Sequence, residues 1–299
     1  MRSISTVVAL ALSLPVAGQT TLGEGDSYAW GANFGWIEMA PQQPAPSTGV
    51  GFRFGEFSCS GYVWSANTGW INCGDGTPAN GINYANDNNS DFGVNHYGTG
   101  GLYGMAWSPN IGWINFGWWT LEPDNPDRPR VDLVTGEFSG YAWSANCGWI
   151  NLGTGILKTD SMDIIDTDGD GISDAFEHAY TNGLAAMTAT SDGDGDGFSD
   201  KDEYLGLTNP LSPLSNLRIT AMNRTVADGT ATELTWISSP ARRYIIERSA
   251  TLALDSWQKS PLDPASFAPD SGNSTTRTTN DTAATQRFYR VKAVIPLQP

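Results

Sequence analysis

The sequence predicts a mainly β protein with an N-terminal β-meander repeat domain, a short acidic loop–helix segment and a C-terminal β-sandwich. Three observations support this prediction. An aromatic motif recurs four times in the first half of the 299-residue chain, and two acidic twelve-residue loops follow it. The last part of the chain then alternates apolar and polar residues between turn signals. A chain of this length has room for two or three domains.

Each copy of the aromatic motif predicts a β-hairpin. An aromatic strand is followed by a turn built on Asn and Gly, which tolerate positive φ, and by a second strand that begins with Trp. The two tryptophans of a copy are six residues apart, so we expect them to face each other across the hairpin. The first tryptophans of successive copies are 34, 43 and 36 residues apart. The four copies are Tyr28–Ile37, Tyr62–Asn72, Met105–Asn115 and Tyr141–Asn151.

A third strand is predicted to precede most copies, which makes each unit a three-stranded meander. Val50–Phe57 leads into the second copy and Val131–Phe138 leads into the fourth. The first copy lacks such a lead. The two ends of the domain could therefore pair with each other and close the domain on itself. The sequence alone does not decide whether they do.

Ten of the twelve tryptophans lie between Trp30 and Trp149. Burying an indole removes about 150–250 Å² from water, which contributes at most about 4–6 kcal/mol. We therefore expect the stacked meanders to share a Trp-rich core.

The alternative is that some rings are exposed platforms for sugar rings, with Asn72, Asn115 and Asn151 bonding to hydroxyl groups. The candidate ligand-binding residues are Trp118 and Trp119. Neighbouring strand residues point to opposite faces, so one of these two rings should face solvent unless both sides are covered.

The three cysteines fit an exported protein with at most one intrachain disulfide. Cys59 and Cys73 flank the second hairpin, and a bridge between them is the favoured pairing. They are two residues out of direct register, which a bulge at Ser60 would correct. Cys147 occupies a turn position and is expected to be a free thiol. The alternative is three unpaired cysteines.

Most of the net charge of −16 lies in Asp160–Glu203, which holds thirteen acidic residues and one lysine. The chain has no basic stripe, which argues against nucleic acid as a partner.

Two loops within Asp160–Glu203 place oxygen donors at positions 1, 3, 5, 9 and 12, with Gly at position 6 and a backbone carbonyl at position 7. A hard cation takes six to eight oxygen ligands. The two loops are therefore predicted to form a short calcium loop–helix segment with Ca²⁺ as its cofactor. The predicted ligands are Asp166, Asp168, Asp170, Ile172, Asp174, Glu177, Asp192, Asp194, Asp196, Phe198, Asp200 and Glu203.

A short helix is expected after each loop, at Asp174–Tyr180 and Asp200–Leu205, with a Ser or Asp cap. The two loop–helix units, with their trailing Tyr180–Asn182 and Leu207–Pro210, resemble the thrombospondin type 3-like calcium repeats of bacterial exported proteins. The resemblance implies a calcium-stiffened connector or stalk. Dockerin modules, which use similar paired loops to bind a scaffold partner, are the alternative.

The final part of the chain resembles the fibronectin type III-like domain of bacterial secreted proteins. The motifs that carry the likeness are Leu234–Trp236, Tyr244–Ser249 and Arg287–Val291. The resemblance implies that this domain extends or attaches the protein rather than catalysing a reaction. Its short strands suggest a sandwich. The expected strands are Leu217–Thr225, Thr232–Ile237, Tyr244–Arg248, Ser274–Thr279 and Arg287–Ile295.

The N-terminus is predicted to be a secretory signal peptide at residues 1–18. Arg2 precedes an apolar run, Val7–Val16, which is too short to span a bilayer. No later segment is apolar and long enough to be a membrane helix, so we expect a secreted or cell-surface protein without a transmembrane segment. The predicted domains are residues 19–155, 156–212 and 213–299.

Catalysis is not expected. The two histidines, His96 and His178, argue against a His-based triad or zinc site, and His96 is expected at the polar surface of a long loop. A secreted glycoside hydrolase is the enzymatic alternative. It would draw two carboxylates from a set of six. The set is Glu38, Glu56, Asp75, Asp91, Asp132 and Glu137.

The sequence therefore predicts an exported, calcium-binding, non-catalytic cell-surface or matrix interaction protein. The calcium segment would act as a metal-stiffened spacer, and the partner would be a polysaccharide or another surface protein. A carbohydrate-binding protein that uses exposed Trp is the alternative. Four arginines of the C-terminal part could also form a cationic patch that binds polysaccharide. The simpler interpretation is that they are solvent-exposed residues on strands. The four arginines are Arg242, Arg243, Arg287 and Arg290.

Overall fold

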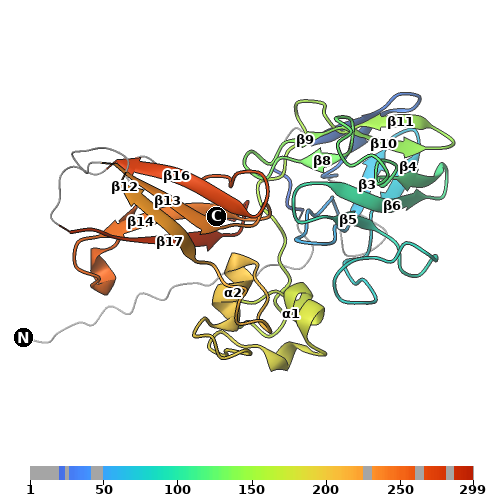
Figure 1. Ribbon diagram of the computed structural model, residues 1–299. Helices are drawn as coiled ribbons and strands as arrows, with labels where there is room; N and C mark the ends of the chain where they lie inside the picture. Colours follow the sequence, from blue (N-terminus) through green and yellow to red (C-terminus); the bar gives the residue numbers. More distant parts are fainter. Residues whose placement is uncertain are drawn as a thin grey trace, which may run out of the picture.

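In the computed structural model the chain forms three parts that lie against one another (Figure 1). The repeats build a closed barrel, two short helices carry the acidic loops, and two small sheets form the C-terminal part, so the mainly β fold class is confirmed. No helix in the described part of the chain is long and apolar enough to cross a bilayer. The predicted signal peptide lies outside the described residues. The structure describes residues 20–23, 27–41, 50–224, 231–259, 266–280 and 286–298.

Eight short strands, two from each repeat, close into the barrel. They are β1 (Tyr28–Gly31), β2 (Gly35–Glu38), β3 (Tyr62–Ser65), β4 (Gly69–Asn72), β6 (Leu102–Ser108), β7 (Gly112–Asn115), β10 (Tyr141–Ser144) and β11 (Gly148–Asn151). Their order is β4-β3-β2-β1-β11-β10-β7-β6, and β6 pairs in turn with β4. The first half of β6 also pairs with β5 (Val94–His96). The closed sheet has no free edge within the ring.

The four hairpins follow one another around the barrel in the same register. Within each hairpin the two tryptophans lie directly opposite each other, as their spacing predicts. Between hairpins, the last residue of one faces the first tryptophan of the next. These pairs are Glu38–Trp64, Asn72–Trp107, Asn115–Trp143 and Asn151–Trp30. The last pair joins the fourth hairpin to the first and closes the ring.

The paired inward-facing residues of the hairpin strands are aliphatic, and the repeat tryptophans lie outside the barrel. Trp30 and Trp36 are 40% and 51% exposed, whereas Ala29 and Ile37 beside them are 0% and 3% exposed. The predicted Trp-rich core is therefore wrong. An eight-stranded barrel is just wide enough for modest side chains, and a residue next to an inward-facing one must face outward. The inward pairs are Ala29–Ile37, Val63–Ile71, Ala106–Ile114 and Ala142–Ile150.

The hairpin turns are joined by a second ring of hydrogen bonds, which we call the asparagine ring. In each turn the Asn side-chain amide donates to a backbone carbonyl in the turn of the preceding hairpin. The four bonds are Asn33 to Cys147, Asn67 to Phe34, Asn110 to Thr68 and Asn146 to Ile111, at 2.8–3.0 Å. The turn glycines adopt φ of +72° to +88°, as a tight reversal requires. The Asn–Gly turn thus shapes each hairpin and also links it to its neighbour.

The predicted leading strands do not form a third strand of each meander. Before the fourth copy, β8 (Arg130–Val131) pairs with β9 (Phe138–Ser139) as a small sheet of its own. Asp132 accepts hydrogen bonds from two following backbone N–H groups, and Gly136 has a φ of +78°. These turn residues fold the expected strand back on itself.

Cys59 and Cys73 are buried free thiols, and the predicted disulfide between them is absent. Val94 lies between the two backbones: its N–H donates to the Cys73 carbonyl, and its carbonyl accepts from the Cys59 N–H. Two strand spacings of about 4.8 Å exceed the roughly 7 Å Cα separation that a disulfide tolerates. Burial raises the pKa of Cys59 to about 12 and also raises that of Cys73, so both are unreactive thiols. Cys147 is also a free thiol.

The C-terminal part is a small sandwich whose two sheets have the orders β12-β13-β16 and β15-β14-β17. Leu234, Trp236, Tyr244 and Ile246 form its core. Its elements are β12 (Ile219–Arg224), β13 (Ala231–Ile237), β14 (Arg243–Ser249), η2 (Leu254–Ser256), β15 (Gln258–Lys259), β16 (Ser274–Asn280) and β17 (Phe288–Val294). The sequence analysis anticipates five of the six strands and misses the two-residue β15.

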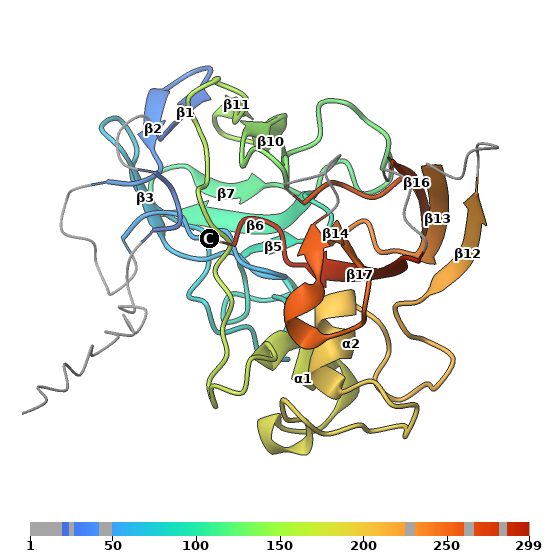
Figure 2. The ribbon, with the colours of Figure 1, turned by 90° about the vertical axis from the view of Figure 1, so that its left-hand side faces the viewer.

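The three parts meet at a buried polar cluster, here called the junction. Arg242, in the turn before β14, forms an ion pair with Glu56 of the barrel at 3.1 Å, and these side chains are 2% and 5% exposed. Tyr204, from the acidic segment, donates its hydroxyl to Glu56 at 3.2 Å and accepts from Arg242 at its carbonyl at 3.0 Å. Arg242 is thus buried and is not part of a surface cationic patch. The acidic segment packs against both β parts rather than holding them apart (Figures 1 and 2).

Candidate metal centres

Each acidic loop is folded tightly by its own carboxylates. In the first loop, the two oxygens of Asp166 accept from the N–H groups of Gly169 and Gly171 at 2.8 and 2.9 Å, and Asp170 accepts from Ile172 at 2.8 Å. Gly169 and Gly171 have φ of +77° and +88°, which an L side chain rarely adopts. The same bonds recur in the second loop, where Asp192 accepts from Gly195 and Gly197 and Asp196 accepts from Phe198.

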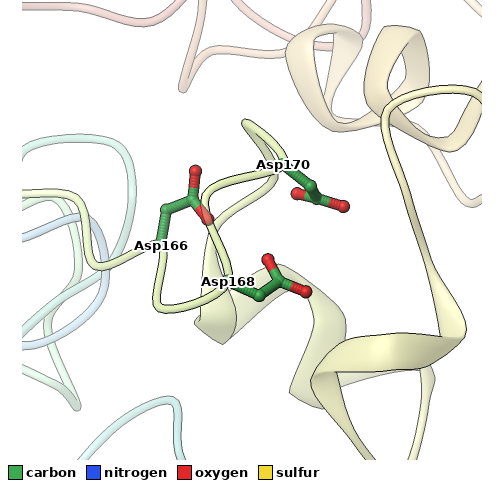
Figure 3. A group of neighbouring side chains, drawn as sticks. All are labelled: Asp166, Asp168 and Asp170. Carbon is green, nitrogen blue, oxygen red and sulfur yellow. The ribbon is translucent and has the colours of Figure 1, made fainter.

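The alternating aspartates converge in both loops. Asp166, Asp168 and Asp170 each offer a carboxylate oxygen within 4.8 Å of the others, and so do Asp192, Asp194 and Asp196. Figure 3 shows the three side chains of the first loop turned toward a shared space. Carboxylate oxygens gathered in this way suit a hard cation such as Ca²⁺.

Two short helices follow the loops, α1 (Asp174–Tyr180) and α2 (Asp200–Gly206), with the turn η1 (Leu184–Ala186) between them. Ser173 caps α1 and Ser199 caps α2 through their side-chain oxygens, so the predicted loop–helix arrangement is confirmed. Each helix carries the twelfth residue of its loop in its first turn. The helices therefore fix the direction in which Glu177 and Glu203 point.

Glu177 and Glu203 are buried carboxylates without full hydrogen bonding. Glu177 is 0% exposed, and neither of its oxygens has a partner; Glu203 is 1% exposed, and its Oε2 has none. Burial, followed by the charges of nearby aspartates, raises the pKa of each glutamate to about 7. Burying a carboxylate in this way is costly unless a counter-charge is bound. Oxygens of Asp170 and Asp194 are also buried without a partner.

The ninth position of each loop has another role. The carboxylate of Asp174 accepts from the N–H and hydroxyl of Thr167, and that of Asp200 accepts from Gly193 and Ser191. Both aspartates thus hold the start of their own loop. This fits a ninth residue that meets the ion through water.

The seventh position differs between the loops, because the side chain of Ile172 is 0% exposed and that of Phe198 is 38% exposed. Thr208, which the ligand pattern did not include, donates to Oε1 of Glu203 at 3.2 Å. The one sequence feature that could have pointed to Thr208 is its place in the Thr-Asn-Pro ending that follows the second loop. Thr208 orients the closing glutamate of that loop.

The comparisons with known proteins concern this same segment. The family model described as bacterial TSP3 repeat matches residues 166–180 and 192–213, the two loop–helix units. No curated protein and no solved structure matches the chain. The match, the converging aspartates and the orphaned glutamate oxygens together support a calcium-binding segment of the TSP3 type. The likeness of the sandwich to fibronectin type III domains remains a prediction.

The structure gives the other predicted ligand residues different surroundings. Trp119 is 6% exposed, with its indole N–H bonded to the Leu102 carbonyl, whereas Trp118 is half-buried and packs edge-on against Trp149 at 5.1 Å. The three asparagines at the strand ends use Oδ1 to accept from the backbone N–H two residues later. They are Asn72, Asn115 and Asn151.

Proposed function

We propose that this chain is an exported, calcium-binding interaction protein without catalytic activity, in which calcium holds the barrel and the sandwich in a fixed arrangement. The observation that supports it is the pair of buried glutamates, Glu177 and Glu203, whose oxygens lack partners inside TSP3-type loops. Each loop would supply carboxylates and one backbone carbonyl to a Ca²⁺ ion.

The second loop connects this chemistry to the junction. Glu203 is followed directly by Tyr204, which bonds to both Glu56 and Arg242. A cation that fixes Glu203 would therefore also fix the first turn of α2 and the junction. In this proposal the calcium segment holds the barrel and the sandwich together rather than acting as a spacer, because its helices contact both β parts.

Calorimetry with Ca²⁺ tests the proposal. Extracellular calcium modules bind at about 10⁻⁴–10⁻³ M, so about 10 mM Ca²⁺ should raise the unfolding free energy by roughly 1.4–2.7 kcal/mol for each loop that it occupies. Glu177→Gln should weaken binding at least about tenfold, because it removes a two-oxygen ligand.

The same variant should behave oppositely without metal. In EDTA, Glu177→Gln should be as stable as the wild type or more stable, since a buried charge has been removed. Asp124→Asn is a matched control, because Asp124 is exposed in a barrel loop. An absence of binding heat at millimolar Ca²⁺ would sink the proposal, and so would equal effects of the two variants.

Export and the lack of catalysis are further parts of the proposal. TSP3 repeat proteins are typically extracellular. Among the candidate hydrolytic carboxylates, Glu56 is paired with Arg242, and Asp75, Asp91 and Asp132 accept bonds from nearby backbone N–H groups. Release of reducing sugar from a polysaccharide panel, lost in a single carboxylate variant, would overturn the non-catalytic role.

A further inference from the structure

One repeat departs from the other three on the outside of the barrel. In the first, second and fourth copies, a tyrosine at the start of the hairpin packs edge-on against the second tryptophan. These contacts are Tyr28–Trp36, Tyr62–Trp70 and Tyr141–Trp149, with ring centroids 6.0–6.4 Å apart. In the third copy Met105 takes the place of the tyrosine. Trp113 therefore lacks the tyrosine that packs on its equivalents.

A cavity of about 240 Å³ lies at this position. Phe92 packs against Trp113 at 5.1 Å and an interplanar angle of 88°, and Met105 lies beside them. The other side of the cavity is polar and comes from the long loop between β4 and β5. The loop residues that line it are Asn86, Asp87, Asn88 and Asn89. The cavity thus combines an aromatic side with a side rich in amide and carboxylate groups.

Two polar side chains of this cavity retain hydrogen-bonding capacity. Asn86 and Asn88 are used within the loop, where they bond to Tyr84, Gly93 and neighbouring groups. Asp87 is exposed and accepts one bond, from Asn88, and within the described residues the exposed Asn89 amide makes none. These groups are available to a ligand, and Trp113 is 38% exposed.

We propose that this cavity, which we call the Trp113 pocket, binds one pyranose unit of a neutral polysaccharide. The apolar C–H face of the sugar would lie on the indole, and its hydroxyls would bond to Asp87 and Asn89. Pockets for drug-sized ligands are about 300–1,000 Å³, so this smaller one suits a single ring. None of the described residues that line it is a Lys or Arg, and Asp87 and the net charge of −16 disfavour an anionic sugar. The inference rests on the proposed role of the chain as an interaction protein, not on calcium.

Affinity electrophoresis of the full chain tests the proposal, with gels containing a mixed-linkage β-glucan, a xylan, a galactomannan or alginate. We expect at least one neutral polysaccharide to retard the protein in both calcium and EDTA. Trp113→Ala should weaken that retardation at least about tenfold, because the indole would be covered by the bound sugar and supply most of the apolar contact. Asn89→Ala, which alters an exposed side chain without a partner, should weaken it while leaving the unfolding midpoint unchanged.

Trp36→Ala is the matched control, because Trp36 is the equivalent tryptophan of the first repeat and is not among the residues that line the cavity. It should bind as the wild type does. Retardation by alginate alone, no retardation by any neutral polysaccharide, or equal losses from Trp36→Ala and Trp113→Ala would each overturn the proposal. Calorimetry with Ca²⁺ is read separately, so failure of the sugar site is distinct from failure of the calcium site.

Discussion

At the scale of single residues, His96 shows a role that the sequence does not reveal. The sequence analysis expects it at the polar surface of a loop, but it is 1% exposed. Its Nε2 accepts from the Gly100 N–H at 2.8 Å, and its Nδ1 bonds to the Gly55 carbonyl at 3.1 Å, which assigns the proton to Nδ1. The ring is therefore a neutral bridge between two segments of the barrel domain.

Burial lowers the pKa of His96 to about 4 from an ordinary value of 6.5. The unfolded chain then binds more protons than the folded one below pH 6.5, so stability is full above that pH and is lost as the pH falls toward 4. The loss should reach about 2 kcal/mol at pH 5. We expect guanidinium unfolding, followed by Trp fluorescence in saturating Ca²⁺, to show this loss in the wild type and not in His96→Gln. Equal losses in both proteins would contradict the prediction.

The metal ligands illustrate what spacing can and cannot predict at this scale. Aspartates at alternating positions and a glutamate at the twelfth follow from the needs of a hard cation, so the converging groups could be read from the sequence. The bonds of Asp174 and Asp200 to their own loops could not, because they depend on how each loop closes.

At the scale of elements, the same Asn–Gly turn has a local and a non-local effect. The sequence predicts the hairpins and their facing tryptophans, because both follow from turn chemistry and strand alternation. It misassigns the tryptophans to the core, because which face of a hairpin is inside depends on barrel closure. The asparagine ring depends on closure in the same way, since every bond in it joins two different hairpins.

Removing one member of the asparagine ring should weaken the barrel. Asn146→Ala deletes the amide that donates to the Ile111 carbonyl at 3.0 Å. We expect a loss of about 1 kcal/mol in the free energy of unfolding, measured with guanidinium. Asn89→Ala, an exposed asparagine outside the ring, should cost almost nothing. If the two substitutions have the same effect, the ring does not stabilise the barrel.

At the scale of the whole molecule, the junction is a place where side chains from all three parts meet. Glu56 and Arg242 are 186 residues apart in the sequence. The position of Glu56 after Gly55 predicts a structural role in a turn, but no local pattern identifies a partner so far along the chain. Domain arrangement was for this reason the least predictable aspect of the fold.

Breaking the junction should loosen the molecule. Arg242→Met leaves Glu56 buried without its counter-charge, which typically costs 3–5 kcal/mol. We expect a lower unfolding temperature and a larger radius of gyration by small-angle X-ray scattering in calcium. Adding Glu56→Gln to the same chain should recover part of the loss, because the unpaired charge is removed. An unchanged radius and unfolding temperature in Arg242→Met would show that other contacts hold the parts together.

Closure of the barrel also governs the order of its folding. The pairing of Trp30 with Asn151 joins residues 121 positions apart, whereas each hairpin pairs residues only a few positions apart. Bringing such distant residues together costs chain entropy before their contact stabilises the fold, and a high contact order slows folding. Individual hairpins form early but are marginal alone. We therefore expect the barrel to become stable only when its last hairpin is present, and a chain still being synthesised to stay open until then.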